Sequence, residues 1–111
     1  MVRGESGPTR LPDGVPATAA PYGRRMIAVE LALTPTPERL AARPEHRALL
    51  ARLYDEGAVL AAGPWADDSG ALLVFTGDRA EVDAILESDP YYRAPGVEIV
   101  AIREWQPAVG P

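Results

Sequence analysis

The chain has 111 residues, 47% hydrophobic and 24% charged, which fits one globular domain with a modest core. Its formal net charge of −5 argues against binding to nucleic-acid phosphates. The chain has no Cys and no Lys, which excludes a disulfide framework, a thiolate nucleophile and a lysine Schiff base. Its single His cannot supply the histidine cluster of a typical zinc site. Neither a metal nor a cofactor is therefore predicted.

The first 25 residues are predicted to form a disordered tail, because Pro or Gly interrupts them every few residues and no hydrophobic periodicity develops. The folded domain is expected to span residues 26–105, and residues 106–111 are expected to form a second, shorter tail. Translation starting at Met26 is a possibility that the sequence leaves open.

The N-terminal segment lacks the apolar core of a secretory signal. No apolar run approaches the roughly 20 residues that span a bilayer. The expectation is a cytoplasmic protein that does not enter membranes.

The first half of the domain changes from a strand pattern to a helix pattern. Residues 26–33 form a short apolar strand, which the Thr-Pro-Thr-Pro segment at 34–37 ends. Thr36 can cap a short helical turn, and Pro44 is expected to mark a kink or a fresh helix start. The pattern over residues 44–56 is helical, with an apolar stripe that includes His46.

The second half contains three more strand patterns and one more helix. Gly63 and Pro64 end the second strand, and Asp89 with Pro90 ends the second helix, because the residue before proline disfavours helical geometry. The expected elements are strands at 58–65, 71–76 and 97–105, a hairpin loop at 67–70, a helix at 79–88 and a loop at 91–96.

The resulting order is β-α-β-β-α-β, the α+β ferredoxin-like pattern in which two helices cover one face of a four-stranded antiparallel sheet. The strands carry apolar residues on both faces, so a second cover is needed. We expect a homodimer that packs the two open sheet faces together. The alternative is that the N-terminal tail folds back over this face.

Five short segments resemble the YciI-like (YCII-related) family when they are taken in this order and spacing. They are Arg43-Pro-Glu-His46, Asp55-Glu-Gly57, Ala62-Gly63-Pro64, Ser88-Asp89-Pro90-Tyr91 and Trp105. The resemblance covers residues 26–105 and implies a dimeric α/β barrel whose active site is a paired histidine and aspartate. By this resemblance, His46 and Asp89 occupy the catalytic positions. Most members have no assigned reaction, and one relative removes chloride from a chlorinated hydroxyhydroquinone.

His46 and Asp89 are therefore the candidate catalytic residues, and each also has a purely structural interpretation. A lone histidine on an apolar helix face is often bonded to a backbone carbonyl, and an Asp-Pro pair often only forms a turn. Histidine titrates near neutrality and suits proton transfer. A paired carboxylate is expected to orient its ring and to favour its protonated form.

The candidate ligand-binding residues flank this pair in the sequence. Arg43 can hold an anion or be a solvated charge, and Gly63 with Pro64 can line the site or only end a strand. Tyr91 can donate to a ligand oxygen. Ser88 belongs to the same group but can also bond locally at the helix end, and nothing near it in the sequence would activate it as a nucleophile.

The leading interpretation is a small cofactor-free enzyme that binds a small cyclic or aromatic compound. A single His–Asp pair suits general acid–base chemistry in an elimination or isomerisation, as in a lyase, an isomerase or a dehydrochlorinase. A non-catalytic ligand-binding or assembly module remains an alternative, because the fold does not determine the function. A cofactor-independent monooxygenase of the related barrel type is a further alternative.

Overall fold

The computed structural model describes residues 25–110. The tail predicted at 1–25 lies outside the described residues except for Arg25, whose carbonyl oxygen accepts a 2.7 Å hydrogen bond from the backbone nitrogen of Gly77. Residues 106–110, which follow the last strand, contain no helix or strand. None of the helices in residues 25–110 is long and apolar enough to cross a membrane.

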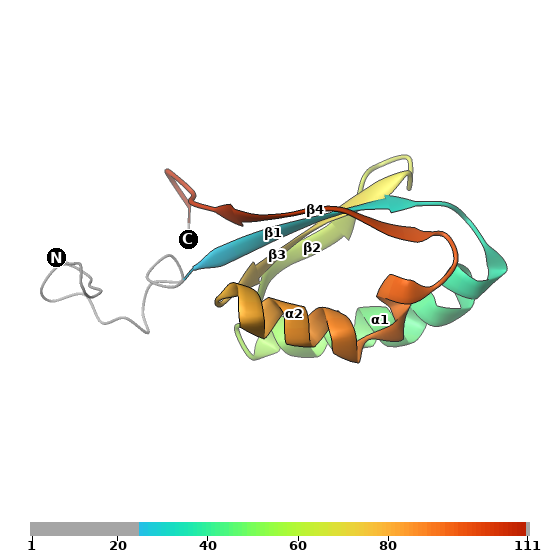
Figure 1. The fold of residues 1–111 in the computed structure, drawn as a ribbon, viewed down its shortest axis with the longest axis horizontal. Coiled ribbons are helices and arrows are strands. Elements are labelled where there is room, and N and C mark those ends of the chain that lie inside the picture. The colour runs from blue at the N-terminus through green and yellow to red at the C-terminus, as the bar shows by residue number, and fades with distance from the viewer. Residues whose placement is uncertain (1–24, 111) are drawn as a thin grey trace, which may run out of the picture.

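The sheet has the strand order β2-β3-β1-β4, and every neighbouring pair is antiparallel. Its strands are β1 (Met26–Leu33), β2 (Val59–Pro64), β3 (Gly70–Thr76) and β4 (Val97–Trp105). Helix α1 (Pro37–Asp55) connects β1 to β2, and helix α2 (Arg79–Ser88) connects β3 to β4. Figure 1 shows both helices on the same side of the sheet. The predicted ferredoxin-like fold is confirmed.

Helix α1 is one continuous helix, so Pro44 does not mark the fresh helix start that was one of the two expectations for it. Thr36 caps its first turn by accepting a 3.1 Å hydrogen bond from the Arg39 backbone nitrogen, and Pro37 fits the first helical position. Pro44 removes one hydrogen bond without ending the helix, because the turns on both sides remain bonded. Gly57 follows the helix at φ 84°, a left-handed conformation that glycine adopts without strain.

The core lies between the sheet and α2. Ile27 pairs with Phe75 and Val29 pairs with Leu73 across the ladder of β1 and β3, and these four side chains are at most 3% exposed. Val82 of α2 is fully buried against them. Burial of each such side chain contributes about 1.5–3 kcal/mol to the free energy of unfolding.

Helix α1 covers the sheet in a different way, because its two buried residues, Arg39 and His46, are both polar. Leu50 and Leu53 are only partly buried. The space between α1 and the sheet is therefore not filled by apolar side chains, and a cavity lies there.

Candidate active site

His46 and Asp89 form a direct hydrogen bond although 43 residues separate them in the sequence. The distance between Nδ1 of His46 and Oδ2 of Asp89 is 2.7 Å. The two residues are 6% and 5% exposed, so the contact is shielded from water. His46 comes from the middle of α1, and Asp89 comes from the junction between α2 and the short 3₁₀ helix η3 (Pro90–Arg93).

The turn that contains Asp89 holds its carboxylate in place. Asp89 ends α2 and caps η3, with Pro90 at the first position of η3. Its Oδ1 accepts a 2.9 Å hydrogen bond from the Tyr91 backbone nitrogen, which leaves Oδ2 for His46. Both carboxylate oxygens therefore have a partner, and the turn interpretation and the pairing interpretation of Asp89 are compatible.

Two tyrosine rings fix the plane of the His46 imidazole. Tyr91 stacks on it with ring centroids 3.9 Å apart and an interplanar angle of 8°. Tyr92 meets it edge-on, with centroids 5.2 Å apart and an angle of 89°. Within residues 25–110, the second imidazole nitrogen, Nε2, has no hydrogen-bond partner. The imidazole itself lines the cavity.

Burial lowers the pKa of His46 below its ordinary value of 6.5. The hydrogen bond and the charge of Asp89 raise this pKa, but they do not offset the desolvation, and the nearby charge of Arg47 lowers it further. The expectation that the carboxylate would favour the protonated form describes only one of these effects. The resting histidine is neutral at pH 7, with Nδ1–H donating to Asp89 and the Nε2 lone pair free.

Burial also raises the pKa of the Tyr92 hydroxyl, and the negative charge of Asp89 adds to this effect. The hydroxyl oxygen of Tyr92 is buried and has no hydrogen-bond partner. Tyr92 therefore stays neutral and serves as an aromatic wall beside His46.

Arg39 is a member of the site that the sequence did not reveal. It is only 1% exposed, and its guanidinium donates to three oxygens. The acceptors are the Thr34 carbonyl at 2.8 Å, the Tyr91 hydroxyl at 3.2 Å and Oδ2 of Asp68 at 3.0 Å. Arg39 therefore ties the start of α1 to the hairpin between β2 and β3 and to the tyrosine that stacks on His46.

Asp68 reaches this position from the hairpin loop with φ 62°, a left-handed conformation that Asp tolerates better than most residues. The same Oδ2 atom lies 3.9 Å from Nη1 of Arg43. Asp67 and Asp68 suggest only a turn in the sequence. The spacing of Arg39 and Arg43, one helical turn apart and ahead of His46, is the one feature of the sequence that points to a shared role.

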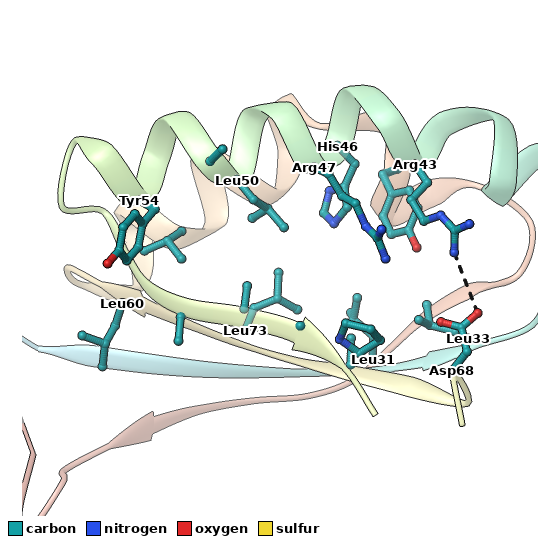
Figure 2. Close-up of a pocket in the computed structure, with 18 of the residues that line it drawn as sticks. Leu31, Leu33, Arg43, His46, Arg47, Leu50, Tyr54, Leu60, Asp68 and Leu73 are labelled. Atoms are coloured by element: carbon teal, nitrogen blue, oxygen red, sulfur yellow. Dashed lines mark ion pairs between the residues drawn. The ribbon is translucent and has the colours of Figure 1, made fainter. Parts of the chain in front are cut away.

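The cavity has a volume of about 770 Å³ and lies between α1 and the sheet. This size falls within the range of small-molecule sites. Figure 2 shows His46, Arg43, Arg47 and Asp68 toward one end of it, and Leu50, Tyr54 and Leu60 toward the other. The arginines and Asp68 therefore gather at one end, beside Leu31 and Leu33, and the other end is mainly apolar apart from Tyr54.

Four of the five predicted ligand-binding residues line this cavity together with His46. They are Arg43, Gly63, Pro64 and Tyr91. The structure does not bring the fifth, Ser88, to the cavity; Ser88 is exposed, and its hydroxyl donates a 2.8 Å hydrogen bond to the Ile85 carbonyl, as a local helix-end contact would. Asp89 is not among the lining residues, and its contact with His46 connects it to the cavity. Within residues 25–110, no three His, Cys, Asp or Glu side chains converge as metal ligands.

Comparison with known proteins agrees with the fold and with the segments that carry the resemblance. The sequence model of the YCII-related domain matches residues 22–106, which includes all seven elements described above. No curated protein is significantly similar to the chain. On the extent of this match, the chain belongs to the YCII-related domain family.

Proposed function

We propose that the protein is a small enzyme in which His46 transfers protons within the cavity and Asp89 orients it. The observation that carries the proposal is the buried 2.7 Å contact between Nδ1 and Oδ2, which leaves Nε2 without a partner among residues 25–110. A histidine that is oriented by a carboxylate through one nitrogen presents the other nitrogen as a base.

The proposed reaction begins with a carbon acid next to a carbonyl group. The neutral Nε2 takes the proton, and the electron pair moves into the carbonyl to form an enolate. Asp89 stabilises the imidazolium that results. In an elimination, the electron pair then expels a leaving group, which imidazolium protonates; in an isomerisation, imidazolium returns the proton to a different carbon. The Tyr91 hydroxyl, which accepts from Arg39, keeps its own proton to donate to the carbonyl oxygen.

The proposed substrate is a small cyclic or aromatic compound. The cavity volume of about 770 Å³ and its aromatic and aliphatic walls support this size and class. Arg43, Gly63, Pro64 and Tyr91 form the proposed ligand-binding set. Ser88 is left out of the set, because its hydroxyl is bonded on the exposed side of α2.

We further propose that the protein is a homodimer formed through the sheet face opposite the helices. The ladder places Ala28, Leu72, Val74 and Ala101 on that face, because they alternate with the core residues. Leu72 is 38% exposed. The same face also carries Glu30, which pairs with Leu72 and Ala101, and Arg103, which pairs with Ala28. Exposed apolar side chains on a sheet face without helices are typical of an interface.

The test is a turnover screen of cyclic and aromatic carbonyl and hydroxyl compounds with the wild type, His46→Asn and Asp89→Asn. We expect His46→Asn to lower kcat/KM by about 10²- to 10⁴-fold, the usual contribution of a general base. The exposed neighbour Glu45 supplies the control, and Glu45→Gln should retain wild-type activity. Equal turnover by the wild type and His46→Asn would contradict the proposal, and a tight ligand released unchanged would favour a binding module.

The pH dependence of the same reaction gives a second readout. Because burial lowers the pKa of His46 below 6.5, the basic form persists to mildly acidic pH. We expect kcat/KM to stay constant from neutral pH down to below 6.5 and to fall as the pH drops through the His46 pKa. A rate that rises on acidification would show that the protonated form is the active one.

A further inference from the structure

The stripe of α1 that faces the cavity is cationic along half of its length. Arg39, Arg43 and Arg47 follow one another at intervals of four residues, and all three line the cavity. Residues four apart lie on the same side of a helix. The face that a helix turns toward a sheet is usually apolar. Arg39 is explained by its three hydrogen bonds, but Arg43 and Arg47 need an explanation other than packing.

The described residues do not balance the charge of these arginines. Arg39 is fully engaged, with Asp68 at 3.0 Å. Arg43 reaches the same Asp68 oxygen only at 3.9 Å. Arg47 makes no hydrogen bond or ion pair with any residue in 25–110. The remaining acid that lines the cavity is Asp55, which lies eight residues beyond Arg47 on α1, about 12 Å along the helix axis.

The rest of the cavity is suited to an apolar body. Beyond the arginines, the lining consists mainly of Leu50, Val59, Leu60 and Leu73. In Figure 2 the Arg43 and Arg47 side chains extend from α1 toward the sheet near His46, while Leu50 and Leu60 lie farther along the cavity. A ligand that spans the cavity therefore meets positive charge at the end near His46 and mainly hydrocarbon at the other, where Tyr54 and Asp55 also line the cavity.

We propose that the natural ligand is a carboxylate with an apolar ring or chain, whose carboxylate lies between Arg43 and Arg47 beside His46. A planar guanidinium matches the two oxygens of a carboxylate. A monoanion is favoured over a phosphate dianion, because Asp68 pairs with Arg39 and lies 3.9 Å from Arg43, which leaves Arg47 as the one guanidinium of the three without a counter-charge among residues 25–110. The inference rests on the proposed function in taking this cavity as the active site. Binding of the carboxylate, however, depends on the arginines and not on the reaction.

The probes are 3-phenylpropanoate and its neutral amide, 3-phenylpropanamide, titrated into the full chain and followed by backbone amide and His46 imidazole NMR shifts. We expect the acid to bind at least about tenfold more tightly than the amide, a difference of ~1.4 kcal/mol. The shifts should lie on α1 and β2 around the cavity. Added salt should weaken the binding of the acid and leave the binding of the amide unchanged, because ions screen exposed charges.

Arg47→Gln should remove most of this preference, and Arg47→Lys should retain part of it. Arg47 is exposed, so neither change should unfold the protein. Arg52→Gln is the matched control, because Arg52 is exposed on α1 but does not line the cavity, and it should bind the acid like the wild type. Equal affinity for acid and amide, tighter binding of phenyl phosphate, no measurable binding of the acid, or an unchanged preference in Arg47→Gln would overturn the inference.

The outcomes separate this inference from the proposed function. His46→Asn should bind 3-phenylpropanoate at least as well as the wild type, because the imidazole is not the anion's partner. Acid binding that depends on Arg47, without any turnover that depends on His46, would contradict the proposed function alone. Turnover of neutral compounds that depends on His46, without a preference for acids, would contradict the carboxylate inference alone.

Discussion

The candidate site is a chain of contacts in which each residue is held by the next. Asp89 fixes one imidazole nitrogen of His46, and its other oxygen is held by the Tyr91 backbone. The Tyr91 ring stacks on His46, and its hydroxyl accepts from Arg39, which Asp68 holds in turn. Such a network fixes the His46 imidazole, because every rotation of the ring breaks at least one contact.

Arg39 should therefore matter for stability as well as for the site. We expect Arg39→Met to lower the free energy of unfolding by about 3 kcal/mol, because it leaves acceptors at Thr34, Tyr91 and Asp68 without their donor. Urea denaturation would measure this loss. The exposed Arg93 supplies the control, and Arg93→Met should change stability by no more than about 0.5 kcal/mol. An equal effect of the two substitutions would show that the Arg39 network contributes little.

The sequence predicted part of this site at the level of single residues. The resemblance assigned His46 and Asp89, and the cavity also brings Arg43, Gly63, Pro64 and Tyr91 together. Arg39 was missed because an arginine near a helix start resembles a solvated charge, and its partner Asp68 lies 29 residues away in a loop that resembles an ordinary turn. Only the three-dimensional arrangement shows that the two meet.

The secondary-structure elements were predicted more completely than the site, because strand and helix periodicities are local properties. The exception is Pro44, which was expected to mark a kink or a fresh helix start but lies inside the continuous helix α1. Sequence rules weigh the one hydrogen bond that proline removes. The helix is also stabilised by its Thr36 cap, by the contacts of His46 with Asp89 and Tyr91, and by the packing of Leu50 against the core.

The β2–β3 hairpin gives a test at the level of elements, because its two glycines differ in their surroundings. A methyl group at Gly70 would collide with the Leu31 carbonyl oxygen and lie 2.7 Å from Nε1 of Trp65. A methyl group at Gly63 would meet nothing within 4 Å. We expect Gly70→Ala to lower the free energy of unfolding by about 1–3 kcal/mol, and Gly63→Ala to change it by less than about 0.5 kcal/mol.

Thermal and urea unfolding of the two variants would measure these differences. Gly63 lines the cavity, so Gly63→Ala should alter ligand affinity while leaving stability unchanged. Equal losses of stability in the two variants would show that the close approach of Gly70 to Trp65 and Leu31 does not constrain the hairpin.

At the scale of the whole molecule, the sheet has one face covered by helices and one face without them. We expect light scattering to give twice the chain mass, and Leu72→Glu to give a monomer, because it places a charge in the proposed interface. Leu40→Glu is the matched control, since Leu40 is 40% exposed on α1 and Leu72 is 38% exposed on the sheet. A monomeric wild type, or equal behaviour of the two variants, would contradict the sheet-to-sheet dimer.

The NMR titration of His46 in the wild type and in Asp89→Asn tests the central claim most directly, because the chain has a single histidine and its imidazole resonances need no assignment. We predict a wild-type pKa below 6.5, because burial outweighs the effect of Asp89. In Asp89→Asn this pKa should fall further, since the substitution removes the charge that favours imidazolium while the burial stays. A His46 pKa that is the same in both proteins would contradict the His46–Asp89 pair and, with it, the proton-transfer site.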